Sequence, residues 1–395
     1  MNTAEMNDDA VALLAGARRL APLVERHRGQ FDNDRQLPLE IVDGLHAGGL
    51  FRMWVPRALG GFELDPLNFL RVIEELSRLD GSVGWCAVIP AGYARLAGAL
   101  REDVARRIFT GAGRGILVGT LNPTGKAIVT DGGYRVTGKW GYGSFIAYGE
   151  WVLGNCVIED ASGPRRAGGA PEFRLCLFPI GRTEIVDMWH VGGLRATGSN
   201  DYSVSDLFVP EEHTIPLVDF QPPSHRSGPL YAVPMTSTFV SCIATVTLGI
   251  ARAAIEALTE IAETKTTAGS TIALRDKPLA QADLARAEAL VGAGRAYLWS
   301  ELGAMWDSVV KGNATRLEDR AKVRLAAVHA TQCAIQAVDI IYKLGGGASL
   351  LQSGRLERCS RDVHAAGQHV AVSPLSNFEP VGRVLFGLPP GMARF

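Results

Sequence analysis

Apolar residues recur at intervals of three and four through the first 112 residues, which is the spacing of helices with one buried face. Polar residues, mainly Arg and Glu, occupy the positions between them. Pro38 stands where the first turn of a helix tolerates proline, and Gly48-Gly49 ends the same segment. The pattern predicts an N-terminal helical domain over 1–112, with helices over 9–28, 37–48, 66–79, 80–96 and 103–110.

Between residues 113 and 220 the pattern changes to short β-rich runs. The runs GILVGTL, YRVTGKW, WVLGNCVI, FRLCLFPI, EIVDMW and YSVSDLFV alternate with turn signals such as Asp-Gly-Gly and Gly-Pro. Runs this short, with no helix between them, predict a small antiparallel barrel or sandwich as the central domain. A linker rich in Pro, Ser and Gly is predicted over 221–229.

Long Ala-rich apolar stripes return after residue 230. They predict four helices, of which the first three are about 30 residues long; the stripes cover 236–264, 281–311, 316–344 and 355–372. Helices of this length and composition usually pack as a bundle, often at a subunit interface. The chain is therefore predicted to be an α+β protein of three domains that ends in a four-helix bundle over 230–395.

Composition narrows the classes of function. Lys and Arg total 40 against 41 Asp and Glu, so no net charge attracts nucleic acid or an anionic membrane. The six cysteines lack CxxC or Cys/His spacing, which argues against a metal site and a disulfide framework. The N-terminus is acidic and polar, unlike a secretory signal, and no uninterrupted apolar run is long enough to span a membrane. These features predict a cytoplasmic enzyme that binds a small molecule.

Two histidines lie near the end of the last predicted helix, in the run RDVHAAGQH at 361–369. A histidine that is neutral near pH 7 can take a proton from a weak acid such as a phenol. Because five residues turn a helix through about 500°, the rings of His364 and His369 would point about 140° apart. Only one of them could then face a given pocket. Arg361 and Asp362 are expected to form an ion pair that anchors the helix.

Six motifs follow one another in the order found in the acyl-CoA dehydrogenase superfamily. They are PLEIVDGLHAGGLFRMWVPRALGG at 38–61, EELSRLDGSVGW at 74–85, GTLNPTGKA at 119–127, GGYRVTGKWGYGSF at 132–145, GLRATGSNDYSVSDLFVPE at 193–211 and RLERCSRDVHAAGQH at 355–369. The chain resembles this superfamily over essentially its whole length, and within it the flavin-dependent monooxygenase branch. The resemblance implies the same three-domain fold and a homotetramer with flavin sites near subunit interfaces.

The residues after Arg361-Asp362 distinguish two activities of the superfamily. Its dehydrogenases usually have a Glu base there, in a Tyr-Glu-Gly-Thr run, whereas this chain has His369 close to that place. The resemblance therefore implies the oxygenase component of a two-component monooxygenase. Such a protein takes reduced flavin (FMNH2 or FADH2) from a separate NAD(P)H-dependent flavin reductase. With O2 it hydroxylates a small aromatic or electron-rich substrate through a flavin hydroperoxide.

Three alternatives stay open at this point. An acyl-CoA dehydrogenase with its Glu elsewhere in the chain would desaturate an acyl thioester with bound FAD. A member of the same branch could oxygenate nitrogen or sulfur in place of carbon. A catalytically silent flavin-binding or assembly protein would keep only the scaffold.

The resemblance also implies which residues form the site. Ser144 falls where a hydroxyl meets the edge of the flavin ring, and His369 is the expected substrate base, with His364 as the alternative. The expected cofactor-binding residues are Thr120, Asn122, Trp140, Tyr142, Ser144, Gly345 and Gly346, the two glycines through backbone contact with phosphate of a neighbouring subunit. The expected substrate-binding residues are Trp85, Tyr93, Thr197 and His364. No metal is expected.

Overall fold

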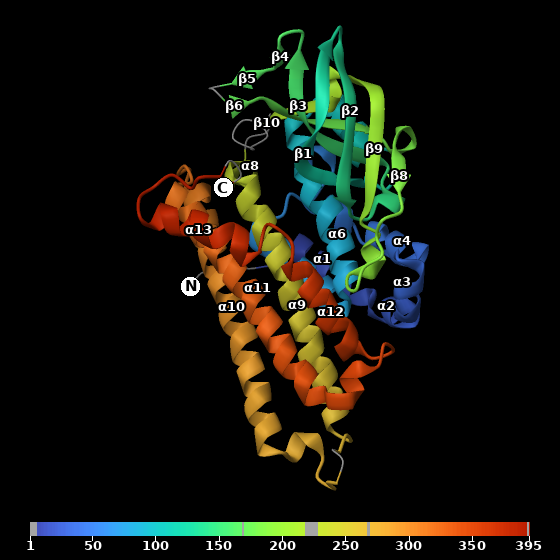
Figure 1. Cartoon of the computed structure of the whole chain (residues 1–395), viewed down its shortest axis with the longest axis vertical. Helices are drawn as coiled ribbons and strands as arrows, with labels where there is room; N and C mark the ends of the chain where they lie inside the picture. Colours follow the sequence, from blue (N-terminus) through green and yellow to red (C-terminus); the bar gives the residue numbers. More distant parts are fainter. Residues whose placement is uncertain (1–5, 168–169, 218–227, 267–268, 393–394) are drawn as a thin grey trace.

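In the computed structural model, the β-domain lies at one end of the molecule and the long C-terminal helices extend from it toward the other (Figure 1). The N-terminal helices pack beside the junction between the two. The structure describes residues 6–167, 170–217, 228–266, 269–392 and 395. Residues 221–227 of the predicted linker lie outside the described residues, so that prediction is not tested there.

Four of the five predicted N-terminal helices form close to their predicted spans, but the helix predicted over 9–28 is divided into two at Leu20, and a short helix over 31–34 was not predicted. Capping side chains fix the ends of the helices on both sides of residue 80. The Asp65 side chain accepts the Asn68 N–H at 2.9 Å, and Pro66 occupies the first turn of the helix that follows. Asp80 ends that helix and caps the next by accepting the Ser82 N–H at 2.9 Å. The helices are α1 (Asp8–Arg19), α2 (Ala21–His27), α3 (Phe31–Asp34), α4 (Leu39–Ala47), α5 (Pro66–Leu79), α6 (Gly81–Tyr93) and α7 (Glu102–Phe109).

Helix α6 has no polar face. Every residue from Gly81 to Ala91 is buried, as is Tyr93. A helix that is apolar on all sides belongs in the interior of a protein. It packs against α5, the long C-terminal helix α9 and strand β1, so it lies at the junction of all three parts of the chain. The N-terminal domain therefore reaches the centre of the molecule through α6.

The main sheet of the central domain is mixed, so its strands are not antiparallel throughout, as was predicted. Its eight strands follow the order β10-β7-β3-β1-β2-β9-β8, with β4 paired to β3. β1 and β3 are parallel, with Leu117 opposite Trp151, and the other neighbours are antiparallel. Local patterning does not encode this long-range pairing, which explains the error in topology.

All six predicted β-rich runs form strands. β5 and β6 make a separate two-stranded sheet. The strands are β1 (Leu117–Thr130), β2 (Gly133–Gly143), β3 (Trp151–Asp160), β4 (Gly163–Pro164), β5 (Arg166–Ala167), β6 (Ala170–Pro171), β7 (Phe173–Pro179), β8 (Glu184–Val186), β9 (Asn200–Pro210) and β10 (Thr214–Leu217).

The C-terminal domain contains the predicted four-helix bundle, formed by α9, α10, α11 and α12. Its helices are α8 (Pro229–Ala232), α9 (Met235–Ala262), α10 (Pro278–Val310), α11 (Leu317–Gly345), α12 (Arg355–Gly367) and α13 (Pro374–Leu385). α12 ends at Gly367 and not at residue 372, and α13 was not predicted. The α+β fold class is confirmed.

Helix α9 is long and apolar enough, by composition alone, to cross a membrane. Its most apolar window has a mean hydropathy of 1.7, and 89% of that window is buried inside the protein. Helix α9 packs against α5, α10, α11 and α12. It is therefore the central helix of the protein core.

Candidate active site

Three hydroxyl groups form a buried chain where the β-domain meets α6. Ser144 follows β2, and Thr197 and Ser199 precede β9; all three side chains are buried. The Trp85 indole N–H on α6 donates to the Ser144 hydroxyl at 3.0 Å, and the Ser144 and Ser199 oxygens are 2.8 Å apart. The Ser199 and Thr197 oxygens are 2.7 Å apart, and the Thr197 hydroxyl donates to the Leu194 carbonyl at 2.8 Å. These contacts join α6 to the loop before β9.

The direction of each hydrogen bond in this chain follows from the number of hydroxyl protons. Thr197 has one hydroxyl proton, which goes to Leu194, so Ser199 must donate to Thr197. Ser199 then has no second hydroxyl proton to donate, so Ser144 must donate to Ser199. The Ser144 oxygen accepts from Trp85 and has a second lone pair left. Ser144 is therefore set to accept a further N–H and has no further proton to donate.

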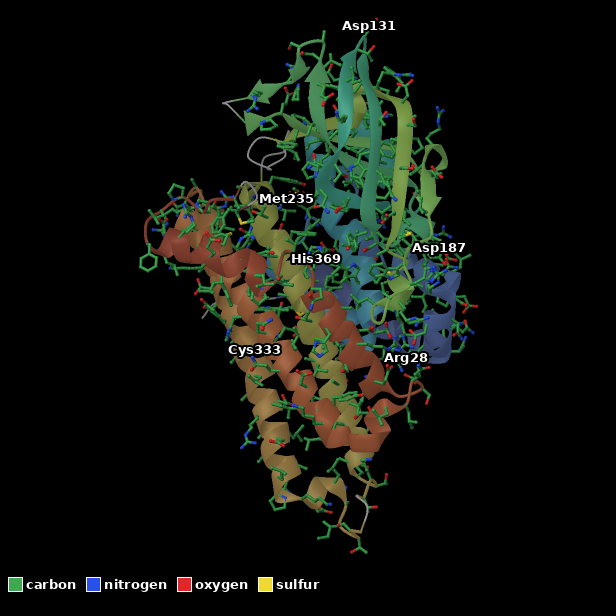
Figure 2. All side chains as sticks on the ribbon, viewed as in Figure 1. Arg28, Asp131, Asp187, Met235, Cys333 and His369 are labelled. Carbon is green, nitrogen blue, oxygen red and sulfur yellow. The ribbon has the colours of Figure 1, made fainter. Side chains whose placement is uncertain are left out.

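His369 lies near the middle of the molecule, just beyond the end of α12 (Figure 2). Its ring meets Trp85 of α6 edge to face at 5.7 Å and Phe239 of α9 at 5.5 Å. Because His369 is outside the helix, the predicted 140° angle between the two histidine rings does not apply. His364 is on α12, exposed, with Nε2 3.0 Å from an Asp339 carboxylate oxygen, so it does not join His369.

The protonation state of His369 follows from its neighbours. The Ala371 N–H donates to Nδ1 at 3.1 Å, and a backbone N–H can only donate. A neutral ring therefore has its proton on Nε2. Burial lowers the pKa of His369 from 6.5 to about 4, so the ring is neutral at pH 7. The ring is thus suited to donate a hydrogen bond from Nε2, whereas taking a proton at Nδ1 requires breaking the Ala371 contact.

An apolar pocket adjoins His369 through Phe239. Its apolar lining comes from Trp54, Val88, Ile89, Leu121, Phe239 and Ile243. Tyr93 also lines the pocket and donates its hydroxyl to the Gly119 carbonyl at 3.2 Å. No Asp or Glu is among the lining residues in the described part of the chain. The pocket is therefore suited to a small and mainly apolar molecule.

Strand β1 bulges next to this pocket. Thr120 pairs with Gly154 of β3 and Gly125 with Cys156, so the four residues 121–124 stand opposite Asn155 alone. The Asn155 amide donates to the Leu121 carbonyl at 2.8 Å across the gap. Thr120 and Asn122 are half-buried in this bulge. Both predicted residues therefore lie where the backbone leaves the regular ladder.

The two predicted aromatic residues of β2 have opposite environments. Tyr142 is 68% exposed, and its ring meets Trp189 edge to face at 6.3 Å. Trp140 is fully enclosed, stacks on Tyr202 at 5.4 Å and donates to the Asn155 carbonyl at 3.0 Å. An enclosed ring has no face to offer a cofactor, so the structure places Trp140 in the core and not at the site.

Gly345 and Gly346 lie at the far end of α12 from His369. The helix between them has 13 residues, which separates the two by about 20 Å. Gly345 is buried, and a Cβ added there would come within 2.0 Å of the Ser349 hydroxyl. Gly346 is exposed. Within one chain, the two glycines and the hydroxyl chain therefore belong to separate regions.

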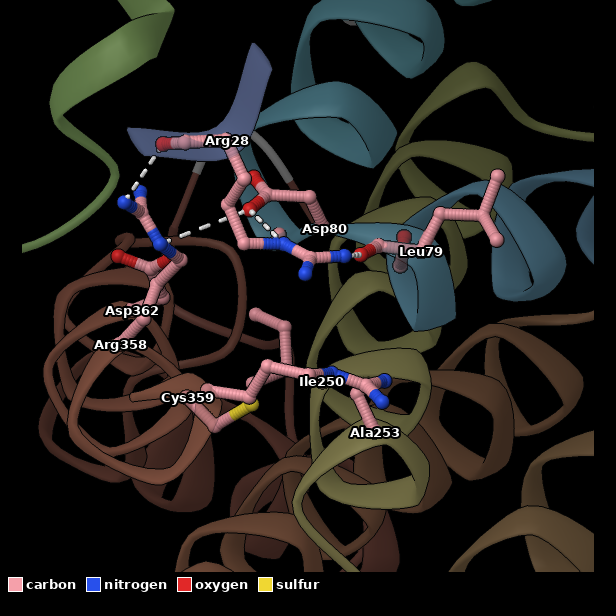
Figure 3. Close-up of a pocket in the computed structure, with 11 residues that line it drawn as sticks. Arg28, Leu79, Asp80, Ile250, Ala253, Arg358, Cys359 and Asp362 are labelled. Carbon is pink, nitrogen blue, oxygen red and sulfur yellow. Dashed lines mark hydrogen bonds and ion pairs between the residues drawn. The ribbon is translucent and has the colours of Figure 1, made fainter. Parts of the chain in front are cut away.

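Arg361 and Asp362 do not bond to each other as predicted. Arg361 bonds Asp32 and Glu357, whereas Asp362 accepts the Leu194 N–H at 2.6 Å. Asp362 and Asp80 line one small buried cavity beside Arg28 and Arg358 (Figure 3). Burial first, and then the charge of Asp80, raise the pKa of Asp362 from 3.8 to about 7. Asp362 thus fixes the loop that ends the hydroxyl chain.

Sequence reasoning missed three residues at this site. Phe239 packs on His369, Arg95 is a buried cation lining the pocket, and Thr238 bonds Arg95. Arg95 could have been noticed as the one charge in the apolar run VIPAGYARLAGAL. Phe239 and Thr238 gave no such signal, because each fits an ordinary core helix. Within the described residues, no group of three or more His, Cys, Asp or Glu could hold a metal ion.

Two family models match the chain. The acyl-CoA dehydrogenase N-terminal domain matches residues 6–98, and the acyl-CoA dehydrogenase C-terminal domain matches residues 241–374. These matches cover the helical domains on both sides of the sheet.

Curated relatives and a solved structure extend the match to the whole chain. Indole-3-acetate monooxygenase of Pseudomonas putida is 30% identical over 379 residues, 96% of this chain and 93% of the relative. The flavin-dependent monooxygenase oxygenase subunit HsaA of Mycobacterium tuberculosis is 30% identical over 97% of each chain. XiaF from Streptomyces sp., solved in complex with FADH2 and glycerol, has a TM-score of 0.87 and 26% identity over 97% of each chain. This protein therefore belongs to the acyl-CoA dehydrogenase superfamily, in its branch of flavin-dependent monooxygenases.

Proposed function

We propose that this protein is the oxygenase component of a two-component monooxygenase that hydroxylates a small aromatic substrate. The observation that supports this most directly is the pocket beside His369. It is lined mainly by apolar side chains, among them Phe239, which contacts the neutral imidazole of His369, and it has no carboxylate among its described lining residues. A thioester dehydrogenase needs a carboxylate base at such a place. A neutral histidine suits the orientation of an aromatic substrate.

The residues around the β1 bulge fit a flavin. A flavin ring has a polar edge that needs backbone hydrogen bonds and flat faces that need apolar contact. The bulge at 121–124 takes backbone groups out of the regular ladder, and the exposed ring of Tyr142 lies on the neighbouring strand. We assign Thr120, Asn122, Tyr142 and Ser144 to flavin contact. Reduced flavin supplies the electrons with which O2 is activated.

Ser144 would favour the reduced form of the cofactor. Its oxygen accepts from Trp85, its proton goes to Ser199, and the remaining lone pair can only accept. Reduced flavin has N–H at its central ring nitrogen N5, whereas oxidised flavin has a bare nitrogen there. An acceptor facing that nitrogen therefore discriminates between the two redox states. The burial of the hydroxyl chain also keeps water away from this contact.

His369 would orient the substrate as a hydrogen-bond donor. Its Nδ1 is occupied by the Ala371 N–H, so Nε2–H is the group available to a substrate oxygen. The edges of Trp85 and Phe239 hold the ring in place on two sides. This assignment replaces the proton-accepting role predicted for His369. A hydroxyl or phenolate oxygen of the substrate is the natural partner of such a donor.

The partners follow from the same proposal. A separate flavin reductase would supply FMNH2 or FADH2; XiaF was solved with FADH2, so FADH2 is the first form to test. All six cysteines are buried free thiols, which suits a reducing, cytoplasmic compartment. We propose a homotetramer in which Gly345 and Gly346 of one subunit approach the flavin phosphate of another.

The test is a single-turnover reaction of the purified full-length protein. FADH2 and a panel of phenols and indoles, including indole-3-acetate, are mixed anaerobically with the protein and then exposed to 18O2. We expect product with one labelled oxygen atom. Loss of colour from bound FAD on addition of an acyl-CoA, without oxygenated product, would contradict the proposal and favour a dehydrogenase.

Variants of His369 test the donor role. His369→Gln keeps an N–H donor and should retain part of the product yield, whereas His369→Ala should lose most of it. His369→Asp supplies a base without a donor and should behave like the Ala variant. Rescue by Asp but not by Gln would show that His369 accepts a proton. Fluorescence-monitored binding of FADH2 to all three variants checks that the cofactor site is intact.

A further inference from the structure

Asp362 on α12 holds the loop that precedes β9, although it lies outside the hydroxyl chain. Its Oδ1 accepts the Leu194 N–H at 2.6 Å. The same helix contacts the loop twice more. Arg361 Nη1 donates to the Gly192 carbonyl at 3.0 Å, and a Cβ added to Gly193 would come within 2.1 Å of the Arg361 carbonyl. This part of the loop therefore lies directly on α12, and Asp362 bonds the residue at its end.

Leu194 depends on that bond because its backbone is in the left-handed region. Its φ is 52° and its ψ is 36°, a conformation that is unfavourable for a residue with a Cβ. The hydrogen bond from the Leu194 N–H to the Asp362 carboxyl group offsets this strain. Without that bond, we expect the loop to relax toward an ordinary backbone conformation.

The Leu194 carbonyl is the end point of the hydroxyl chain. It accepts the Thr197 hydroxyl at 2.8 Å, the Thr197 N–H at 3.1 Å and the Trp189 indole N–H at 3.1 Å. A carbonyl can only accept, so the Thr197 hydroxyl proton points away from Ser199. As a result, every hydroxyl proton of the chain points toward Leu194.

A chain of hydroxyl groups has two possible directions, and its end point decides between them. If the Leu194 carbonyl turned away, the Thr197 hydroxyl could donate to Ser199. Ser199 would then donate to Ser144, and the Ser144 proton would become available to N5 of the flavin. A donor at that place suits the bare nitrogen of oxidised flavin, whereas the observed acceptor suits the N–H of reduced flavin. The direction of the chain therefore determines which redox form the site prefers.

We propose that Asp362 is a positioning residue that gives the site its preference for reduced flavin. It acts through Leu194 and the hydroxyl chain, and it lies beside Asp80 in the small cavity of Figure 3. The inference rests on the proposed function, since it requires Ser144 to face N5 of the flavin. A residue that only supported the fold would change the stability of the protein and not the ratio of its affinities for the two flavin forms.

The experiment measures that ratio in the full-length protein. FADH2 and FAD are titrated calorimetrically under anaerobic conditions into the wild type, Asp362→Leu and Asp362→Asn. Leu has the branched shape of Asp and offers no acceptor, whereas Asn keeps an acceptor for Leu194. We expect the wild type to bind FADH2 about tenfold or more tightly than FAD, with most of this preference kept in Asp362→Asn and lost in Asp362→Leu. A folded Asp362→Leu protein with the wild-type ratio would overturn the proposal.

Thr197→Val tests the path from Asp362 to the flavin. It removes the hydroxyl between Leu194 and Ser199 and leaves Asp362 in place, so most of the preference for FADH2 should again be lost. An unchanged ratio in Thr197→Val would overturn the proposal even if Asp362→Leu fails to fold.

Asp80→Asn is the matched control. It alters the charge of the same cavity and does not touch Leu194, so it should keep the wild-type ratio. A loss as large as that of Asp362→Leu would assign the effect to the buried charge and overturn the proposal. A wild type that binds both flavin forms equally would overturn the placement of Ser144 and this inference together, whereas the 18O2 experiment tests the proposed function independently.

Discussion

Replacing Asp362 with Asn should stabilise the protein at alkaline pH relative to the wild type. Asp362 is 1% exposed, and its Oδ1 accepts the Leu194 N–H at 2.6 Å. Oδ2 of Asp362 and Oδ2 of Asp80 are both buried without a hydrogen-bond partner. Two carboxylates thus share one small cavity, in which Arg28 and Arg358 each come within 3.8 Å of the Asp80 carboxylate (Figure 3). The Asn side chain keeps the acceptor for Leu194 and removes one charge.

The sign of the expected change in stability with pH follows from the direction of the pKa shift of Asp362. The pKa of Asp362 is raised from 3.8 to about 7, so the folded state holds the proton to higher pH than the unfolded chain does. Its contribution to stability is therefore complete below pH 3.8 and is lost as the pH rises through 7. Over the interval from about pH 5.5 to about pH 8.5, a shift of this size costs the wild type about 2 kcal/mol. The amide side chain of the Asp362→Asn variant does not ionise, so the variant is spared this loss.

Urea unfolding at the two pH values measures the effect. The free energy of unfolding of Asp362→Asn minus that of the wild type should rise by about 2 kcal/mol from about pH 5.5 to about pH 8.5. Both proteins are compared at one concentration, so that any self-association contributes equally. Asp131→Asn, in the exposed turn between β1 and β2, is the matched control and should give no such change. A difference that is the same at both pH values would refute the shared-cavity account.

Three further predictions concern the site and the bundle. Because burial lowers the pKa of His369 to about 4, the turnover rate should show no loss centred near pH 6.5 that depends on His369. A loss of turnover near pH 6.5 in the wild type that is absent from His369→Gln would contradict the buried neutral ring. Ser199→Ala removes the acceptor of the Ser144 proton, so the amount of H2O2 released per flavin oxidised should rise. The control Ser205→Ala, on the exposed side of β9, should leave this amount unchanged, and equal H2O2 yields from the two variants would exclude the hydroxyl chain from the reaction. Gly345→Ala would set a Cβ 2.0 Å from the Ser349 hydroxyl and should lower the free energy of unfolding by about 1–3 kcal/mol. In the control Gly347→Ala the added Cβ meets nothing within 4 Å, so equal urea midpoints for the two variants would contradict this prediction.

Elements with local signals could be predicted from the sequence, and their pairing could not. The span 66–79 predicted for α5 is the observed one, because the Asp65 cap, Pro66 and the Asp80 stop are all adjacent to it in sequence. The parallel pairing of β1 with β3 is different, because it depends on contacts such as Leu117 with Trp151 across an intervening hairpin strand. The bulge at 121–124 exists only within that pairing. Part of the proposed cofactor site was therefore beyond prediction from local pattern.

The position of His369 outside α12 also depends on contacts between residues that are distant in the sequence. Apolar residues continue at helical spacing after Gly367, so the pattern extends α12 to residue 372. In the structure the Asn377 amide donates to the Val370 and Ser373 carbonyls at 2.9 and 2.8 Å, which stabilises a turn in place of another helical turn. Arg324 of α11 fixes the Asn377 side chain by donating a hydrogen bond to its Oδ1 at 2.6 Å.

The turn after α12 determines the chemistry available to His369. On a continued helix, the 369 N–H and the 371 N–H would both bond carbonyls of the preceding turn, and Nδ1 would be left open to take a proton. In the observed turn the Ala371 N–H faces Nδ1 and fixes the proton on Nε2. A bonded pair on two other helices, Arg324 and Asn377, thus sets whether His369 donates or accepts. The identity of a histidine can be predicted from a motif, but its role depends on this distant contact.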